Sequence, residues 1–252
     1  MTSTPLTTTD QRTEPRRDGT RPLGRVLITG AASGLGRAVA GAVAGAGGTP
    51  LLLDRVDPRT NGDPRLADAP RALVDLADPR AAEDAVTRLA EDGLDAVVTA
   101  AGIDACGRMD QVSAAAWERV VQVNLLGTAA VIRAALPALR ANRGRIVTVA
   151  STLGLRALSD ASAYCASKFG VVGMTRALAV ELQGEVGVTL LIPGGMDTAF
   201  FDSRTEQYRP GPDAMLGDPN EVAAAVLFAL SRSAGFEVRE LIVTPSVEPS
   251  WP

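Results

Sequence analysis

The alternation of short apolar runs with longer segments of helical period is the feature that most constrains the fold of this chain. Short runs rich in Val, Leu and Ile are expected to be strands, at residues 25–29, 49–54, 72–75, 94–99, 144–150, 188–192 and 240–244. Segments of helical period lie between them, at residues 34–47, 79–92, 113–141, 161–183 and 219–232. No two-residue hairpin signal joins any pair of strands, and strands joined through helices run parallel. The pattern predicts an α/β fold, a three-layer Rossmann-like arrangement in which helices flank a doubly wound parallel sheet of about seven strands.

The length and composition fit one folded domain. A chain of 252 residues with 46% hydrophobic content can bury a sizeable core, and neither an internal repeat nor a change in composition marks a second domain. We assign residues 23–252 to this domain and expect residues 1–22, rich in Thr, Pro and Arg, to form a disordered tail. The tail lacks the apolar core of a signal peptide, and its acidic residues are untypical of a transit peptide. Because no segment approaches the roughly 20 uninterrupted apolar residues of a membrane span, we expect a soluble, cytoplasmic protein.

Charge and residue usage exclude several classes of function. The net charge of −4 comes from mixed charges without a basic block, so nucleic acid is not an expected partner. Histidine is absent, which removes the commonest metal ligand and the base of Ser-His-Asp and Cys-His arrangements. The two cysteines, Cys106 and Cys165, lack CxxC spacing and fit a reducing compartment. We therefore expect no metal, and proton transfer that uses a carboxylate, tyrosine, lysine or cysteine.

A glycine-rich turn follows the first predicted strand directly and leads into a helix. It contains Gly30, Gly34 and Gly36 within the run TGAASGLG. Glycines allow close backbone approach, and a helix N-terminus offers free N–H donors and partial positive charge, which together suit a dinucleotide pyrophosphate. A tight connection between strand and helix, without a ligand, is the alternative interpretation.

An acidic residue at the end of the second predicted strand supports the dinucleotide interpretation. Asp54 stands where such folds place an acid that accepts hydrogen bonds from the adenosine ribose hydroxyls. Because its charge would repel a 2′-phosphate, NAD is expected rather than NADP. The adjacent Arg55 could pair with a phosphate instead, or the two residues could form a solvated pair.

Four signatures make the chain resemble the short-chain dehydrogenase/reductase family over nearly all of its predicted domain. The family's TGxxxGxG occurs at residues 29–36, and its YxxxK is matched by Tyr164 and Lys168. Its serine, thirteen residues before the tyrosine, matches Ser151, and its helix asparagine matches Asn124. The usual NNAG after the fourth strand is replaced by TAAG at residues 99–102, which leaves the role of the first position of that motif open.

The resemblance implies a set of residues in contact with the cofactor. They are Gly30, Ser33, Gly34, Leu35, Gly36, Asp54, Asp75, Leu76, Ala101, Gly102, Tyr164, Lys168, Pro193, Gly194 and Thr198. Among them, Asp75 resembles the aspartate near the adenine, and Pro193, Gly194 and Thr198 resemble the PGxxxT segment at the nicotinamide amide.

Elementary chemistry agrees with a catalytic role for Asn124, Ser151, Tyr164 and Lys168. Residues four apart share a helix face, so Tyr164 and Lys168 point the same way. A free phenol has a pKa of about 10, and a nearby ammonium together with the positive oxidised nicotinamide is expected to lower it. Tyr164 would then move a proton while Ser151 binds the reacting oxygen. The resemblance gives Asn124 a water that links Lys168 to solvent.

Each of these residues also has an ordinary interpretation. A Tyr-Lys pair on a helix surface, a loop serine and a helix asparagine all occur by chance. Lys168 is the only lysine in an arginine-rich chain, however, and arginine cannot readily relay a proton. Four matches at the expected spacings favour an enzyme that transfers hydride between nicotinamide and a secondary alcohol or ketone. The alternative function is a non-catalytic dinucleotide-binding sensor or scaffold.

The substrate site is expected beneath a lid at residues 194–216. Met196, Phe200 and Phe201 in the lid, with Leu153 and Arg156 after Ser151, are the candidate contacts. Their mixed character predicts a small, partly apolar substrate. An inward Arg156 would favour an anionic substrate, and a solvated Arg156 would not.

The helix at residues 161–183 is rich in small residues, which predicts close helix approach. The resemblance implies pairing of this helix across subunits in a homotetramer or homodimer, and packing on the chain's own sheet is the alternative. The ending at residues 247–252 lacks the glycines often found there in the family, so we expect it to pack on a neighbouring subunit.

Overall fold

One parallel sheet organises the computed structural model, which describes residues 20–58 and 62–250. Its strands are β1 (Arg25–Thr29), β2 (Thr49–Asp54), β3 (Arg71–Leu73), β4 (Ala96–Thr99), β5 (Arg145–Val149), β6 (Gly187–Pro193) and β7 (Glu240–Val243). They lie in the order β3-β2-β1-β4-β5-β6-β7, and every neighbouring pair is parallel. The predicted doubly wound sheet is thereby confirmed.

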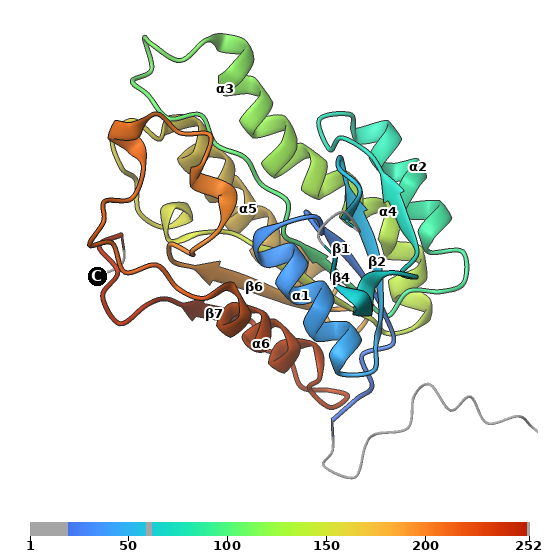
Figure 1. Cartoon of the computed structure of the whole chain (residues 1–252). Coiled ribbons are helices and arrows are strands. Elements are labelled where there is room, and N and C mark those ends of the chain that lie inside the picture. The colour runs from blue at the N-terminus through green and yellow to red at the C-terminus, as the bar shows by residue number, and fades with distance from the viewer. Residues whose placement is uncertain (1–19, 59–61, 251–252) are drawn as a thin grey trace, which may run out of the picture.

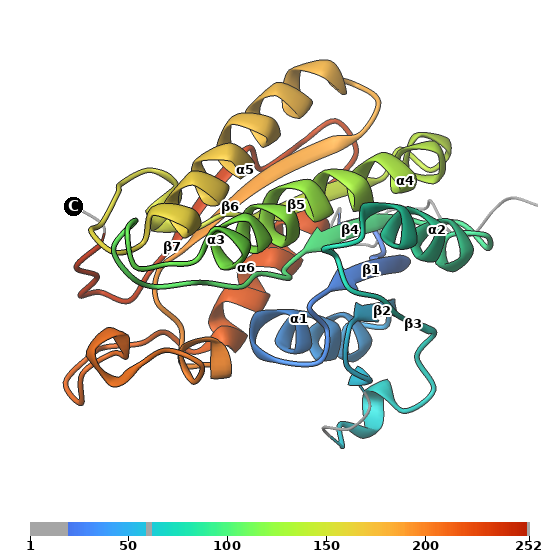
Figure 2. The same cartoon turned by 90° about the horizontal axis from the view of Figure 1, so that it is seen from above.

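Helices cover both faces of this sheet (Figures 1 and 2). They are α1 (Gly34–Gly45), α2 (Pro79–Leu89), α3 (Ala114–Val121), α4 (Thr128–Ala141), α5 (Ser162–Glu181) and α6 (Pro219–Leu230). One face packs against α1 and α6, and the other against α2, α4 and α5. The result is the three-layer arrangement expected from the sequence.

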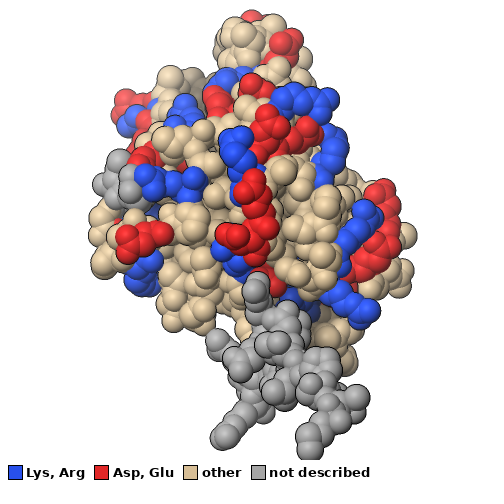
Figure 3. Space-filling model, turned by 90° about the vertical axis from the view of Figure 1, so that its right-hand side faces the viewer, with Lys and Arg blue, Asp and Glu red and all other residues tan. Residues whose placement is uncertain are grey.

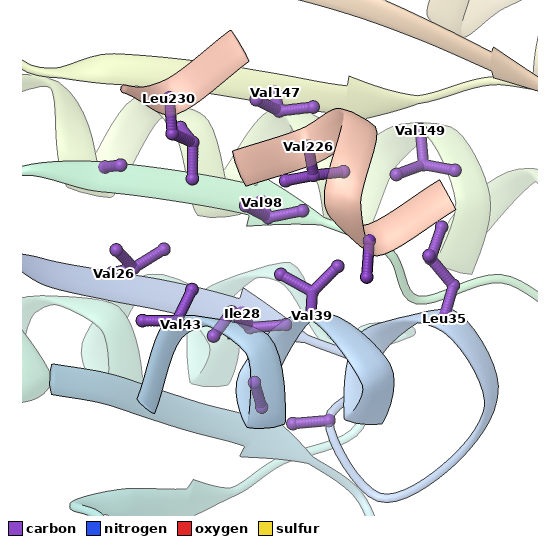
Figure 4. Close-up of a cluster of buried hydrophobic side chains, with 14 of the residues drawn as sticks. Val26, Ile28, Leu35, Val39, Val43, Val98, Val147, Val149, Val226 and Leu230 are labelled. Atoms are coloured by element: carbon purple, nitrogen blue, oxygen red, sulfur yellow. The ribbon is translucent and has the colours of Figure 1, made fainter. Parts of the chain in front are cut away.

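Strands of the sheet centre are buried on both sides and mostly apolar, because helices cover both of their faces. All four residues of β4 and all five of β5 are buried. In Figure 4, Val39 of α1 and Val226 of α6 meet Val98 of β4 within one cluster of buried side chains. This core fixes α1 against the sheet, and with it the glycine turn that begins the helix.

The segment predicted as one helix at 113–141 is interrupted. Ser113 caps its start, as expected, by accepting a hydrogen bond from the Ala116 N–H at 3.2 Å. A π-helical turn at Gln122–Gly127 then separates α3 from α4. Gly127 shows one packing constraint at this turn, because an added Cβ would lie 2.7 Å from the Leu76 carbonyl oxygen. Such turns are rare and often occur at functional sites.

The run Ala114–Ala141 is long and apolar enough for a membrane span by length and composition alone, but half of its most apolar window is buried inside the fold. Its helices pack on the sheet and on α2 and α5 as core helices. Basic and acidic side chains are interspersed on the face beside α2 (Figure 3).

Residues 20–22, which were predicted to belong to the tail, contact the folded domain. The Arg21 N–H donates to the Ser231 carbonyl at 3.1 Å, so residues 20–22 run along the folded body. The rest of the predicted tail, residues 1–19, lies outside the described residues.

Candidate active site

A cleft of about 750 Å³ opens at the carboxyl ends of the strands, beside the point where the strand order reverses between β1 and β4. Open α/β sheets bind their ligands there. All residues predicted to contact a cofactor line this cleft: Gly30, Ser33, Gly34, Leu35, Gly36, Asp54, Asp75, Leu76, Ala101, Gly102, Tyr164, Lys168, Pro193, Gly194 and Thr198.

The glycine turn is shaped by close backbone contacts. Gly30 has a positive φ of 70°, and a Cβ there would lie 2.9 Å from the backbone of Ala101. A Cβ on Gly36 would overlap the carbonyl of Gly30. Among the described residues, no side chain caps the N-terminus of α1, and the first turn of this helix holds no acidic residue. The turn therefore presents backbone donors and positive partial charge to the cleft, which suits a phosphate group.

Asp54 ties the glycine turn to the end of β2. Its Oδ2 accepts from the Ala32 N–H at 2.9 Å, and its Oδ1 accepts from the Val56 N–H at 3.1 Å. The side chain is half-buried and faces the cleft, as does the neighbouring exposed Arg55. Both groups on which the choice between NAD and NADP depends are thus in the cleft.

Asp75 is held ionised at the same end of the cleft. A hydrogen bond from the Ala77 N–H at 2.9 Å lowers the pKa of the Asp75 carboxyl, and a bond of 2.6 Å from Arg119 lowers it further.

Tyr164 and Lys168 lie together on α5, as their spacing predicts. The Lys168 ammonium is 5.6 Å from the centre of the Tyr164 ring and donates to the Val149 carbonyl at 2.9 Å. Burial lowers the pKa of Lys168 to about 8. It also raises the pKa of Tyr164 above its ordinary value, against a smaller opposite effect of the hydrogen bond with Ser151. The expected lowering is therefore not produced by this chain alone, because desolvation outweighs the nearby groups.

Asn124 lies behind the cleft, within the π-helical turn, and is fully engaged. Its Oδ1 accepts from the Ile103 N–H at 2.8 Å, while its Nδ2 donates to the Ile103 carbonyl at 2.9 Å and to Ser167 Oγ at 3.0 Å. Ser167 Oγ in turn donates to the Tyr164 carbonyl at 2.8 Å. A Cβ on Gly102 would be 3.6 Å from both Asn124 Oδ1 and Lys168 Nζ. The amide thus joins the segment after β4 to the helix that bears Tyr164.

The TAAG segment after β4 lacks the two asparagine side chains of the usual NNAG, and a side chain of β1 holds it in place. Thr29 Oγ1 accepts from the Ala101 N–H at 3.0 Å and so holds the segment after β4. The Thr99 hydroxyl, in contrast, is buried without a hydrogen-bond partner among the described residues.

The predicted lid lies over Tyr164. The Phe200 ring is 5.7 Å from the Tyr164 ring, and the Arg204 guanidinium lies 4.6 Å from the centre of the Phe201 ring. Arg204 also forms a 2.6 Å ion pair with Asp104, whose side chain is only 4% exposed.

Four of the five candidate substrate residues line the cleft: Leu153, Met196, Phe200 and Phe201. The prediction for Arg156 is wrong, because this residue is exposed and does not line the cleft. The short 3₁₀ turn Thr152–Gly154 carries the chain away from the cleft before residue 156 is reached.

Sequence reasoning missed several polar residues of the cleft, namely Asp104, Thr152, Glu248 and Ser250. The sequence did carry a signal for Asp104, because it lies two residues after Gly102, which was predicted to contact the cofactor. Glu248 and Ser250, near the C-terminus, gave no such signal, and the expectation that the ending at residues 247–252 packs on a neighbouring subunit stays a prediction. The C-terminal segment, as far as residue 250, contacts the cleft of its own chain: Ser250 Oγ is 2.6 Å from Thr152 Oγ1.

Comparison with known proteins identifies the family. A family model described as short chain dehydrogenase matches residues 25–209. This chain belongs to the short-chain dehydrogenase family. It is 32% identical to an L-fucose dehydrogenase of Bos taurus over 91% of this chain and 92% of that protein. It is 33% identical to the (2S)-[(R)-hydroxy(phenyl)methyl]succinyl-CoA dehydrogenase subunit BbsD of Thauera aromatica, over 86% of this chain and 92% of the relative.

Solved structures agree on the fold of this short-chain dehydrogenase. A putative NAD(P)-dependent gluconate 5-dehydrogenase of Beutenbergia cavernae with bound NADP matches with a TM-score of 0.77 and 33% identity, over 88% of this chain and 96% of that one. An actinorhodin polyketide ketoreductase with NADPH matches with a TM-score of 0.79 and 26% identity, over 92% and 98% of the two chains. The protein is an oxidoreductase, and several of the similar solved structures contain NADP or NADPH.

Proposed function

We propose that this protein transfers a hydride between NAD and a small, partly apolar secondary alcohol or ketone, with Tyr164 as the acid and base. The observation that supports this most is the meeting of Ser151, Tyr164 and Lys168 in the cleft that the glycine turn also lines. A pyrophosphate-binding turn and a proton-transfer group in one cleft are what such a reaction requires.

The residues present fit a dinucleotide. The backbone donors of the glycine turn would bind the pyrophosphate, and Asp54 would accept hydrogen bonds from the adenosine ribose. The segment Pro193 to Thr198 would contact the nicotinamide end of the cofactor. When bound, the nicotinamide supplies or accepts the hydride. Gly30 and Gly36 allow the tight backbone of this turn, because a Cβ at Gly30 would meet the backbone of Ala101 and a Cβ at Gly36 would overlap the Gly30 carbonyl.

Tyr164 would donate and accept the proton in the proposed reaction. Its raised pKa keeps the phenol protonated at neutral pH, ready to donate a proton to a carbonyl oxygen that Ser151 also binds. For alcohol oxidation the phenolate is needed, and the charge of Lys168 and of the oxidised cofactor would favour it. Asn124 would support proton exchange between Lys168 and solvent by holding the segment after β4 close to Lys168.

The preference for NAD over NADP depends on Asp54. A 2′-phosphate approaching the end of β2 would meet a carboxylate that already accepts two backbone hydrogen bonds. Arg55 in the same cleft works in the opposite direction, and several related structures were solved with NADP. A binding titration of both cofactors decides the matter, with a lower Kd expected for NAD.

The substrate class follows from the lid and the turn after Ser151. Leu153, Met196 and Phe200 give the cleft apolar walls, while the charges of Asp104 and Arg204 compensate each other. An uncharged secondary alcohol or ketone fits these walls better than an anion.

Replacing Tyr164 by Phe tests the proposal. A screen of alcohols with NAD, and of ketones with NADH, is followed by the absorbance of the reduced nicotinamide. We expect Tyr164→Phe to lower turnover by about a hundredfold or more, since general acid-base catalysis contributes about 10²–10⁴-fold. Tyr208→Phe is the matched control, because Tyr208 is the only other tyrosine and does not line the cleft. Full turnover by Tyr164→Phe would contradict the proposal, and NAD binding without turnover of any compound would favour a sensor or scaffold.

A further inference from the structure

The chain after β7 returns to the cleft and places a carboxylate there. Glu248 Oε2 accepts from the Gly195 N–H at 2.8 Å, and its Oε1 accepts from the Ser250 N–H at 3.0 Å and from Ser250 Oγ at 2.6 Å. The second contact of Ser250, with Thr152, fastens this tail next to Ser151. Glu248 is therefore fixed in the cleft by hydrogen bonds.

Glu248 lies directly on the backbone that follows β6. A Cβ on Gly194 would overlap the Glu248 carboxylate, so the absence of a side chain at residue 194 is what lets the carboxylate lie there. A Cβ on Gly195 would be 3.9 Å from the same carboxylate oxygen.

The charge of Glu248 has no cationic partner nearby. Its hydrogen bonds come from neutral donors, and no ion pair joins it to an arginine or lysine in the part of the chain that the structure describes. The pKa of Glu248 lies below its ordinary value, because the bonds from Ser250 and Gly195 outweigh the effect of burial. Lys168, in the same cleft, donates to the Val149 carbonyl instead. A negative charge thus stands in the cleft at neutral pH.

The positions of Ser151 and Tyr164 indicate which part of a bound cofactor would lie near the Glu248 carboxylate. A hydride acceptor must contact the carbon whose oxygen is bound by Ser151 and Tyr164, while its other end reaches the glycine turn. Both requirements would bring the nicotinamide end of a bound cofactor to the carboxyl ends of β5 and β6, where Gly194 and Gly195 line the same cleft as Ser151 and Tyr164. The ring is positively charged when oxidised and neutral when reduced.

We propose that Glu248 makes the protein bind the oxidised nicotinamide cofactor more tightly, relative to the reduced one, than the same cleft would with a neutral side chain. This inference depends on the proposed function, since it requires the cofactor to occupy the cleft. Two charges of opposite sign attract in a partly buried cleft where solvent screens them weakly.

The direction of the reaction on the enzyme follows from this preference. Ketone reduction moves a hydride from the reduced cofactor to the carbonyl carbon and a proton from Tyr164 to the oxygen, leaving an alcohol and the positively charged oxidised cofactor. A charge that stabilises the oxidised form shifts the enzyme-bound equilibrium toward the alcohol. The equilibrium in solution is unchanged, because a catalyst cannot alter it.

Separate binding titrations of NAD and NADH with Glu248→Gln test the proposal without any turnover. Glutamine keeps the size of the side chain and removes only its charge. We expect the ratio of the NADH Kd to the NAD Kd to fall by about 3- to 10-fold, mainly through weaker NAD binding. Glu240→Gln is the matched control, because Glu240 stands at the amino end of β7 and pairs with Arg176 at 2.7 Å, away from the cleft. Glu248→Asp keeps the charge and is expected to keep most of the preference.

Different outcomes separate the two proposals. If the Kd ratio of Glu248→Gln equals that of the native protein, or if both cofactors bind equally more weakly, Glu248 only supports the backbone at Gly195 and the inference is wrong. A native protein that binds neither cofactor would instead overturn the proposed function itself.

Discussion

Lys168 is a buried lysine whose ammonium has no opposite charge beside it in the described chain. The residue is 4% exposed, and its ammonium donates one hydrogen bond within the described chain, to the Val149 carbonyl. Burial without an opposite charge disfavours the charged form, which is why the pKa of Lys168 falls to about 8. A charge kept in such surroundings destabilises the fold, and the proposed proton transfer would account for its presence.

Replacing Lys168 by Met should therefore stabilise the protein while it abolishes turnover. The lowered pKa corresponds to about 3 kcal/mol of destabilisation at pH 7, partly offset by the bond to Val149, so we expect a net gain of about 1–2 kcal/mol in the free energy of unfolding. The penalty on the native protein is complete below the folded pKa of about 8 and disappears as pH rises toward the unfolded value of 10.5. Urea unfolding at pH 7 and pH 10 measures this. A variant less stable than the native protein at pH 7 would contradict the argument.

The lid is an element held by few interactions. Its two 3₁₀ turns, Ala199–Phe201 and Glu206–Tyr208, contain no buried residue. The pair of Arg204 and Asp104 connects the lid to the segment after β4, and this pair is much less exposed than the surface ion pairs. Breaking a buried pair costs more than losing a surface one, because the remaining charge is left unpaired.

Asp104→Asn should open the lid without unfolding the domain. We expect amide hydrogen exchange of residues 199–209 to quicken by about tenfold or more and the melting temperature to change little, because the lid adds little to the core. KM should rise as the apolar wall at Phe200 loosens. Arg209→Ala is the control, since Arg209 bonds to lid carbonyls, those of Arg204 at 2.9 Å and Asp202 at 2.7 Å. Unchanged exchange in Asp104→Asn would show that the pair is not what closes the lid.

The elements of the fold could be predicted from the sequence because each strand and helix is specified locally. The apolar runs predict the strands to within a few residues, since runs too short for a helix and bounded by helical segments favour strands. The π-helical turn around Asn124 was missed, because apolar spacing alone does not distinguish one wider turn inside a long helix. The residues predicted to contact the cofactor all line the cleft, whereas Glu248 was not foreseen. Its tail meets the cleft through a contact that spans 98 residues, between Thr152 and Ser250, and no local pattern encodes it.

At the scale of the whole molecule, one face of α5 has no cover within the described chain. Phe169, Gly173, Arg176 and Val180 are exposed at spacings of four, three and four residues, which places them on one side of the helix. Phe169 is 45% and Val180 73% exposed, and a Cβ on Gly173 would meet nothing within 4 Å. Exposed large apolar residues on one helix face often mark association surfaces, so this α5 stripe supports the homotetramer or homodimer that the family resemblance implies.

Charge placed on this stripe should separate the subunits. The chain mass is 26.0 kDa, and we expect light scattering after size exclusion to give two or four times that mass for the native protein. Phe169→Glu and Val180→Glu should each shift the protein toward the mass of one chain, because facing copies of a helix in a symmetric interface would bring the new carboxylates together in an apolar contact. Phe236→Glu is the matched control, since Phe236 is 71% exposed but lies in the loop before β7. Association that survives both α5 variants would place the interface elsewhere, and a native protein that is already monomeric would contradict the proposed assembly.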